Sequence, residues 1–330
     1  MFTGRKEEIN KFKDAYKSKS SKLFCIYGRR RVGKSSLIKE FALRTKSSLY
    51  LFEGLENQHS PEQIKHFSKS LSTYLNDDVI AKAEFKDWDE LFNLITTRIL
   101  IRKNKQTKII IAFDELQWMA AKRSKLIALI KYFWDNVWKE HNIILILCGS
   151  VATFMVDKVI HSKALYGRID YEILLKPLEV QEAILFFQGK RSQDEILKYL
   201  MILGGIPKYL ENINLNKSFR QNIQSLCFEA NGLMVDEFEK IFYSQFKEVT
   251  VYLKIVQALS IQKLSLNEIA TKINIAQGGG LQKYLINLEK AQIISSFQPS
   301  TVIYKSNKNI RYGIIDEYLI FYFKFIKPNL

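Results

Sequence analysis

The chain has 330 residues, of which 47% are hydrophobic and 25% charged, with a formal net charge of +16 at pH 7. This length allows two or three small domains with an ample core, and the composition excludes a disordered or low-complexity protein. Its apolar runs fall short of the ~20 residues that a membrane-spanning helix needs. The charged first ten residues do not resemble a signal peptide. We therefore expect a cytoplasmic protein with no membrane partner.

The positive charge favours an anionic partner such as nucleic acid, a nucleotide or an acidic protein. However, the lysines are interspersed along the chain without one dense basic run. A lysine-rich solvated surface explains the charge equally well. The sequence leaves these two explanations open.

Three cysteines and four histidines are the candidates for disulfide or transition-metal chemistry. Cys25 and Cys148 lie in expected buried strands, and Cys227 lies in an amphipathic helix. None has metal-site spacing, and the histidines are scattered. We expect three reduced structural thiols and no metal cluster of these residues.

The first expected strand, KLFCIY at Lys22–Tyr27, leads into a glycine-rich basic loop. Residues 28–36 read GRRRVGKSS and match G-x-x-x-x-G-K-[ST], the pattern of a phosphate-binding loop. The pattern requires a strand before it and a helix after it, and a helix is expected at Ser35–Arg44. Both flanks favour a phosphate site over a chance match on a basic surface loop.

Each residue type in this pattern has a chemical reason. Gly28 and Gly33 let the backbone turn its N–H groups inward, and the helix N-terminus adds positive partial charge. Lys34 would reach the β- and γ-phosphates, and the Ser35 hydroxyl would ligate Mg²⁺. The side chains at 29–32 occupy free positions of the pattern, so the role of the three arginines is open.

Apolar strands then alternate with helices along the chain. The expected strands are Ser47–Gly54, the apolar part of Lys108–Met119, Asn142–Ser150 and Tyr171–Leu178; the expected helices are Pro61–Leu75, Trp88–Lys103 and Leu126–Trp138. Continuous apolar strands between helices predict an α/β fold with a parallel sheet covered on both faces.

Polar residues follow two of these strands. Asp114 would hold Mg²⁺, commonly through water, and Glu115 would orient or deprotonate the attacking water. Ser150 would hydrogen-bond the γ-phosphate or that water. In isolation, an acidic pair or a serine after a strand is often only a helix cap; the upstream phosphate loop favours the catalytic interpretation for the acids, whereas a cap explains Ser150 almost as well.

Arg168 lies in a short loop before the fifth strand. We expect this loop on the sheet edge where phosphates bind, where an arginine would neutralise charge that develops during phosphoryl transfer. A plain surface arginine is the alternative. The sequence does not distinguish action on its own site from action on a neighbouring subunit, and cis action is preferred.

Strands stop at about Glu179, and helical patterns run to about Lys263. A helix, a turn and a second helix follow at Ser265–Ile294, and an alternating hairpin with Pro299 in its turn follows at Ile293–Asp316. This order predicts a winged-helix domain.

Eight segments in order resemble the archaeal-type ATPase family, which belongs to the STAND branch of the AAA+-like P-loop ATPases. They are FTGRKEEI, YGRRRVGKSSLI, FDELQWM, LCGS, ALYGR, LKPL, GGIPKYL and IIDEYLIFYFKFIKPN. The resemblance covers essentially the whole chain, and LYGR with GGIPKYL is its most specific pair.

The resemblance implies an ATPase core at residues 1–178, a helical lid at 179–246 and a winged helix at 247–330, with ATP or ADP and Mg²⁺ as ligands. It places Gly4 and Arg5 near the adenine and Pro207 against the base. The implied phosphate-binding residues are Gly28, Arg29, Arg30, Arg31, Val32, Gly33, Lys34, Ser35 and Ser36. Asp114 and Glu115 are the implied acids, Ser150 the sensor and Arg168 the loop arginine.

Many members of the family continue into a nuclease-like domain, whereas this sequence stops at Leu330, so we expect no nuclease activity. The leading hypothesis is a slow ATPase used as a nucleotide-controlled switch, with a protein partner or weak non-specific DNA contact. The alternative is a DNA-binding regulator with the ATPase fold as a scaffold. The expected recognition helix, Gly278–Lys290, offers Gln282, Lys283 and Asn287 but no arginine for bidentate guanine contacts, which argues against that alternative.

Overall fold

The structure is a computed structural model that describes residues 2–101, 108–120, 125–246, 248–276, 278–298 and 310–330. The chain divides into two compact units. The first contains residues 1–28 and 33–175, and the second contains residues 29–32 and 176–330. The middle of the glycine-rich loop thus belongs to the second unit.

The described part of the first unit contains a five-stranded sheet with the strand order β2-β3-β4-β1-β5. The strands are β1 (Lys22–Tyr27), β2 (Leu49–Glu53), β3 (Ile109–Asp114), β4 (Ile143–Gly149) and β5 (Tyr171–Leu174). Neighbouring strands all pair in parallel. The expected parallel α/β fold is therefore confirmed, and all the carboxyl ends of the strands share one sheet edge.

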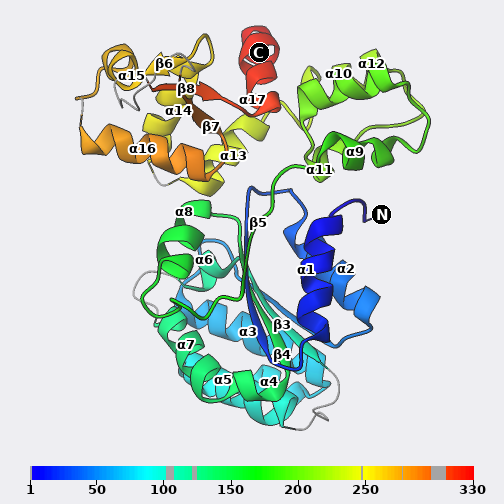
Figure 1. Ribbon diagram of the computed structural model, residues 1–330, viewed down its shortest axis with the longest axis vertical. Helices are drawn as coiled ribbons and strands as arrows, with labels where there is room; N and C mark the ends of the chain where they lie inside the picture. The colour runs from blue at the N-terminus through cyan, green and yellow to red at the C-terminus, as the bar shows by residue number, and fades with distance from the viewer. Residues whose placement is uncertain (1, 102–107, 121–124, 247, 277, 299–309) are drawn as a thin grey trace. The chain divides into compact units, whose positions relative to one another are not determined.

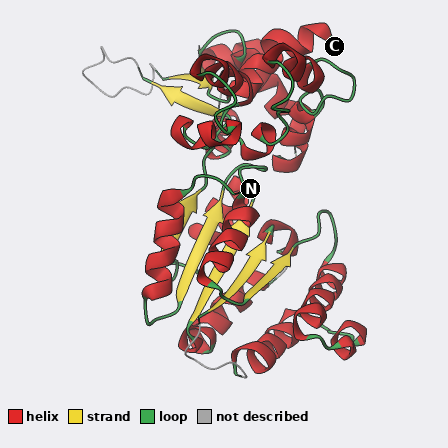
Figure 2. Ribbon diagram, turned by 90° about the vertical axis from the view of Figure 1, so that its right-hand side faces the viewer, coloured by secondary structure: helices red, strands yellow, loops and turns green. Residues whose placement is uncertain are grey.

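Helices cover both faces of this sheet (Figures 1 and 2). The described helices of this unit are α1 (Lys6–Lys17), α2 (Lys34–Thr45), α3 (Ser60–Leu75), α4 (Asp78–Lys82), α5 (Trp88–Ile95), α6 (Leu116–Met119), α7 (Leu126–Asn136) and α8 (Ala152–Phe154), with shorter π or 3-10 turns at Thr96–Leu100, Trp138–His141 and Met155–Ile160. Helix α1 was not predicted. The expected helix Trp88–Lys103 changes to π geometry at Thr96, and residues 102 and 103 lie outside the described residues.

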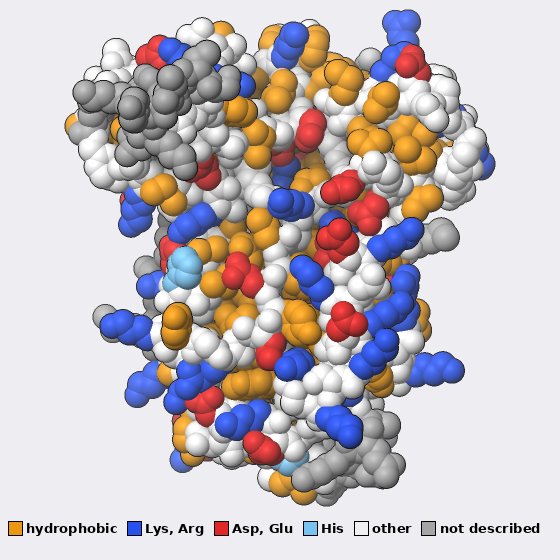
Figure 3. Space-filling model, in the orientation of Figure 1, with side chains coloured by type: hydrophobic (Ala, Val, Ile, Leu, Met, Phe, Trp, Pro, Cys, Tyr) orange, Lys and Arg blue, Asp and Glu red, His pale blue; other side chains and the backbone are white. Residues whose placement is uncertain are grey.

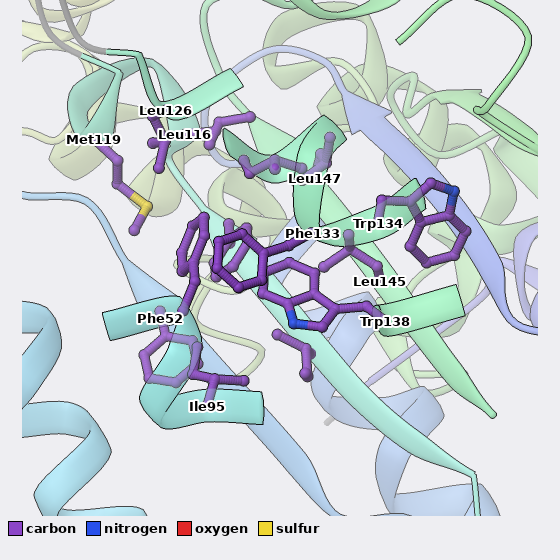
Figure 4. Close-up of a cluster of buried hydrophobic side chains, with 14 of the residues drawn as sticks. Phe52, Ile95, Leu116, Met119, Leu126, Phe133, Trp134, Trp138, Leu145 and Leu147 are labelled. Atoms are coloured by element: carbon purple, nitrogen blue, oxygen red, sulfur yellow. The ribbon is translucent and has the colours of Figure 1, made fainter. Parts of the chain in front are cut away.

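Alternating strand side chains supply two cores. On one face, Phe24 of β1 stacks on Phe12 of α1, with ring centroids 4.4 Å apart. On the other face, β2, β3 and β4 pack against α3, α5 and α7 through an aromatic cluster (Figure 4). Phe52 and Phe133 belong to this cluster, as does the fully buried Trp138. Burial at ~25 cal/mol per Å² of apolar surface makes these faces the main source of stability.

The second unit is mainly helical. Its helices are α9 (Val180–Ala183), α10 (Gln193–Leu203), α11 (Pro207–Leu210), α12 (Phe219–Cys227), α13 (Glu237–Gln245), α14 (Val249–Leu259), α15 (Leu266–Ile273), α16 (Gly279–Lys290) and α17 (Glu317–Phe321), with short turns at Ile184–Phe187, Tyr322–Ile326 and Lys327–Asn329. Its described strands are β6 (Leu264–Ser265), β7 (Ile294–Phe297) and β8 (Arg311–Ile314), in the antiparallel order β6-β8-β7.

The last part of this unit follows the expected order of helix, turn, helix and paired strands. A capping box of Ser265 and Glu268 starts α15. Leu281, Leu285 and Leu288 form the buried face of α16. The expected hairpin turn at Pro299 lies outside the described residues, and the winged helix stays a prediction.

Three further features bear on function. Cys25, Cys148 and Cys227 are buried free thiols. In the described part of the chain, no helix is both long and apolar enough to cross a membrane. Lys and Arg side chains are scattered among acidic and apolar ones over the face in Figure 3, which favours a solvated basic surface for that face.

Candidate nucleotide-binding site

The glycine-rich loop begins where β1 ends. Gly28 has φ +149°, and a Cβ there would lie 2.3 Å from the carbonyl oxygen of Leu175. The chain after β5 approaches this closely because the Leu175 amide donates to the Tyr27 carbonyl at 2.7 Å. Only glycine fits this position, since a contact of 2.3 Å lies inside the van der Waals limit.

Helix α2 starts directly after the loop. Gly33 precedes it with φ +92°, and its carbonyl accepts from the Leu37 amide at 2.9 Å. The first N–H groups of a helix are unpaired within it and favour an anion. Lys34, only 6% exposed, donates its Nζ to the Gly28 carbonyl at 3.0 Å. The ammonium group therefore lies over the loop, where a phosphate would meet it.

Ser35 and Asp114 make direct contact. The Ser35 hydroxyl donates to Asp114 Oδ2, and Asp114 Oδ1 accepts from the Glu115 amide at 3.0 Å. Asp114 is 3% exposed. One hydroxyl and one carboxylate are the oxygen ligands that Mg²⁺ takes from a protein when substrate phosphates and water supply the rest. The residues present fit a Mg²⁺ site that is completed by a nucleotide.

Glu115 stands in the turn between β3 and α6 with φ +50°. Its Oε2 accepts from the Ser150 hydroxyl at 2.6 Å, from the Ser150 amide at 3.3 Å and from the Gln117 side-chain amide. Gln117 also donates to the Ser150 hydroxyl at 3.2 Å. The sheet order brings this trio to the same edge as the loop, because β3, β4 and β1 are neighbours.

The expected position of Arg168 is wrong. A loop before a parallel strand lies at the amino edge, whereas the phosphate loop follows β1 at the carboxyl edge. Asp170 hydrogen-bonds to Leu23 and pairs with Lys22, both at the start of β1. Arg168 donates its Nε to Asp135 at 2.7 and 3.0 Å. The length of β1 separates Arg168 from the phosphate loop of its own chain, which is about 20 Å at ~3.3 Å per residue.

The remaining expected site residues are distributed as follows. In the first unit, Gly4 and Arg5 have φ +74° and +64° and lead into α1, and Arg5 pairs with Glu8 at 3.6 Å. Ser36 is exposed on α2. In the second unit, Pro207 is the first residue of α11. Its expected contact with a base stays a prediction.

The loop arginines also belong to the second unit. Arg29 and Arg31 pair with Asp316 and Glu237. Arg30 is half-buried and Val32 is fully buried. The sequence analysis expected all of residues 28–36 to bind the phosphates. In the structure, the side chains of Arg29 and Arg31 instead contact carboxylates.

Sequence reasoning missed Gln117, Glu237 and Asp316. Gln117 could have been found, because it lies two residues after Glu115 in the acidic motif. Asp316 lies in the family segment IIDEYL, but no spacing relates that segment to the loop; Glu237 lies outside the eight family segments, so no local signal marks it.

Comparison with known proteins identifies the family of the chain. Residues 2–213 match the model of a family described as an ATPase domain found predominantly in Archaea. The chain belongs to this archaeal-type ATPase family. An uncharacterized protein of Methanocaldococcus jannaschii, MJECL04, is 30% identical to this archaeal-type ATPase. The alignment covers 100% of this chain and 70% of the M. jannaschii protein.

Two solved structures share the fold. The Walker-type ATPase PABY2304 of Pyrococcus abyssi has a TM-score of 0.69 at 22% identity, with 98% of this chain and 96% of that chain covered. The ORC2 protein of Aeropyrum pernix, in ADPNP and ADP complexes, has a TM-score of 0.52 at 13% identity, with 97% and 92% covered. Membership in the family makes this chain an ATP-binding P-loop ATPase, as its sequence resemblance implied.

Proposed function

We propose that this archaeal-type ATPase hydrolyses ATP in a Mg²⁺-dependent reaction and serves as a STAND-type switch. The observation that carries the proposal is the carboxyl-edge constellation: Lys34 over the loop, Ser35 on Asp114, and Glu115 held by Ser150. Each of these groups has a role in phosphoryl transfer. A basic surface loop without nucleotide chemistry would not need a buried acid beside the loop serine.

The reaction follows from the roles of these residues. The loop amides and Lys34 bind the β- and γ-phosphates and neutralise their charge. Ser35 and Asp114 would hold Mg²⁺, which would supply further neutralisation of the phosphate charge. Glu115 accepts a proton from the water that attacks the γ-phosphorus, while the bond to the ADP oxygen breaks. ADP and inorganic phosphate are the products.

Ser150 connects the phosphate to the base. Its hydroxyl carries one proton and donates it to Glu115. In the ATP complex, that proton would turn to the γ-phosphate or the attacking water, as expected for a sensor. Glu115 would then keep the Gln117 amide as its side-chain donor. Glu115 would therefore lose the Ser150 hydroxyl donor, and be ready to accept a proton from water, only when the γ-phosphate is present.

The switch proposal concerns the second unit. We assign residues 179–246 to a helical lid and 247–330 to a winged helix, within a cytoplasmic protein. On α16, the Asn287 amide donates to the Tyr252 hydroxyl at 2.7 Å, while Gln282 and Lys283 are exposed. With one of its three polar candidates already engaged, this helix supports weak DNA contact more than base-specific recognition.

The catalytic role of Arg168 is proposed only in trans. Its position at the amino edge contradicts the preferred cis action on its own site. A second copy of the chain would have to present its phosphate loop to Arg168 for the arginine to act.

The test of the function is hydrolysis by the purified protein. We expect phosphate release from ATP that rises with added Mg²⁺ and stops with EDTA, and ATP or ADP among co-purifying nucleotides. Tight ATP binding without hydrolysis under any Mg²⁺ concentration would reduce the protein to a nucleotide-binding module.

A further inference from the structure

Arg29 and Arg31 end in a buried polar cluster of the second unit. Arg29 pairs with Asp316, and their side chains are 7% and 5% exposed. Arg29 also donates to the Tyr209 hydroxyl at 3.0 Å, and that hydroxyl donates to Glu237 at 2.6 Å. The second oxygen of Glu237 pairs with Arg31. We call Tyr209, Glu237 and Asp316 the anchor residues.

Secondary structure fixes each anchor residue. Asp316 is the N-cap of α17, where it accepts from the Leu319 amide at 2.8 Å. Glu237 is the first residue of α13, where the helix dipole favours a carboxylate. Tyr209 lies fully buried on α11. Three helices thus place the acceptors around the two arginines.

The charges of the cluster balance. Two guanidinium groups face two carboxylates, and both guanidinium groups lie within 6.0 Å of the Tyr209 ring centroid. Burial raises the pKa of Glu237 above its ordinary value, against the opposing effect of the two arginines. A buried carboxylate without its partner is strongly unfavourable, so each side of the cluster depends on the other.

The cluster joins three motifs that ATP chemistry alone does not explain. GRRRVGKSS supplies the arginines at positions where the phosphate-loop pattern allows any residue. GGIPKYL supplies Tyr209, and IIDEYL supplies Asp316. Arg29 and Tyr209 are 180 residues apart in sequence. Their meeting gives these segments a shared physical role.

We propose that Tyr209, Glu237 and Asp316 are positioning residues that hold Arg29 and Arg31, so that these arginines anchor the phosphate loop rather than bind ATP. The proposal rests on the proposed ATP binding. Arg29 follows Gly28 directly, and Arg31 is two residues before Gly33, so an anchored pair restricts the backbone that must present its N–H groups to phosphate. Pre-organised loops bind more tightly because less ordering is left to occur on binding. ATP binding and helices α11, α13 and α17 become energetically linked.

The test is a double-mutant cycle of Arg31→Met and Glu237→Gln in the full chain, with ATP affinity in EDTA measured by calorimetry. The proposal predicts that each single variant weakens ATP binding about tenfold, a typical pre-organisation effect. The double variant should bind ATP no more weakly than either single variant. In steady state, the loss falls on KM more than on kcat. The matched control is Asp236→Asn at the N-cap of the same helix. The Asp236 side chain is 68% exposed and pairs with Lys240 at 3.5 Å, so this variant should bind ATP like wild type.

The opposite assignment gives a different result. If Arg31 is itself an ATP ligand, Glu237→Gln releases it, and ATP affinity stays the same or rises; this outcome overturns the anchor. Should Glu237→Gln fail to fold, Tyr209→Phe removes the hydroxyl that joins Arg29 to Glu237, and the same cycle is run with Arg29→Met in place of Arg31→Met.

Failure of the proposed function remains distinguishable. If the wild-type protein binds no ATP, the proposed function is wrong. The double-mutant cycle then uses the free energy of unfolding in urea, measured without nucleotide. Strong coupling between Arg31 and Glu237 there supports the buried pair, whereas additive effects overturn it.

Discussion

Replacing Glu115 with glutamine should separate ATP binding from ATP hydrolysis. Three donors converge on Glu115 Oε2: the Ser150 amide at 3.3 Å, the Ser150 hydroxyl at 2.6 Å and the Gln117 amide. A glutamine carbonyl oxygen can accept the same three bonds, so the side chain should keep its position. Only the proton acceptor is lost.

The expected magnitude follows from that single loss. A positioned general base contributes about 10²- to 10⁴-fold, which is about 3–5 kcal/mol at 1.36 kcal/mol per tenfold change. Turnover in Glu115→Gln should fall by this factor, while ATP affinity should change less than about threefold, because binding depends on the loop and Lys34.

The assay is single-turnover hydrolysis of labelled ATP beside equilibrium binding of the same nucleotide. Glu53→Gln serves as the control, since Glu53 is an exposed carboxylate on the neighbouring strand β2, paired in register with Asp114. Equal single-turnover rates in wild type and Glu115→Gln would refute the assignment and leave Glu115 as a turn residue.

Three further results are expected. Gly28→Ala should abolish ATP binding and lower the melting temperature, because its Cβ would lie 2.3 Å from the Leu175 carbonyl oxygen; a wild-type melting curve would contradict this geometry. Arg168 holds the pKa of Asp135 below its ordinary value of 3.8. The ion pair therefore stabilises the fold at pH values above 3.8, and this stabilisation is lost as the pH falls through the lowered pKa of Asp135. Asp135→Asn should therefore cost about 0.5–1 kcal/mol in urea unfolding at neutral pH and nothing in strong acid, and a constant cost at every pH would rule out the ion pair. Mixing Arg168→Ala with Lys34→Ala should restore part of the ATPase activity if Arg168 acts in trans, whereas no restoration at any concentration would remove Arg168 from the catalytic set.

Much of the first unit could be predicted from the sequence because its strands are continuous apolar runs. All five expected strands form and pair in parallel. Helix α1 was missed, although the helical spacing of its buried residues Ile9, Phe12 and Ala15 could have indicated it.

The candidate site was partly predictable for a similar reason. Residues that follow parallel strands meet at one edge, so Asp114 and Ser150 could be placed beside the loop. The same rule places Arg168, which precedes β5, at the opposite edge, and the sequence contained this information. The anchor residues differ, because no local pattern relates α11, α13 and α17 to the loop, and even α11 is 180 residues from it at the Arg29–Tyr209 contact.

ATP binding by Lys34→Ala tests the account most directly. Lys34 is buried over the loop and donates to the Gly28 carbonyl at 3.0 Å. Arg29 and Arg31, held by their acidic partners, cannot replace its ammonium group at the β- and γ-phosphates. Calorimetry with ATP and Mg²⁺ should show tight binding by wild type and its loss in Lys34→Ala, with both proteins equally folded by circular dichroism. Unchanged ATP affinity in a folded Lys34→Ala protein would contradict the phosphate-loop assignment and the ATPase mechanism built on it.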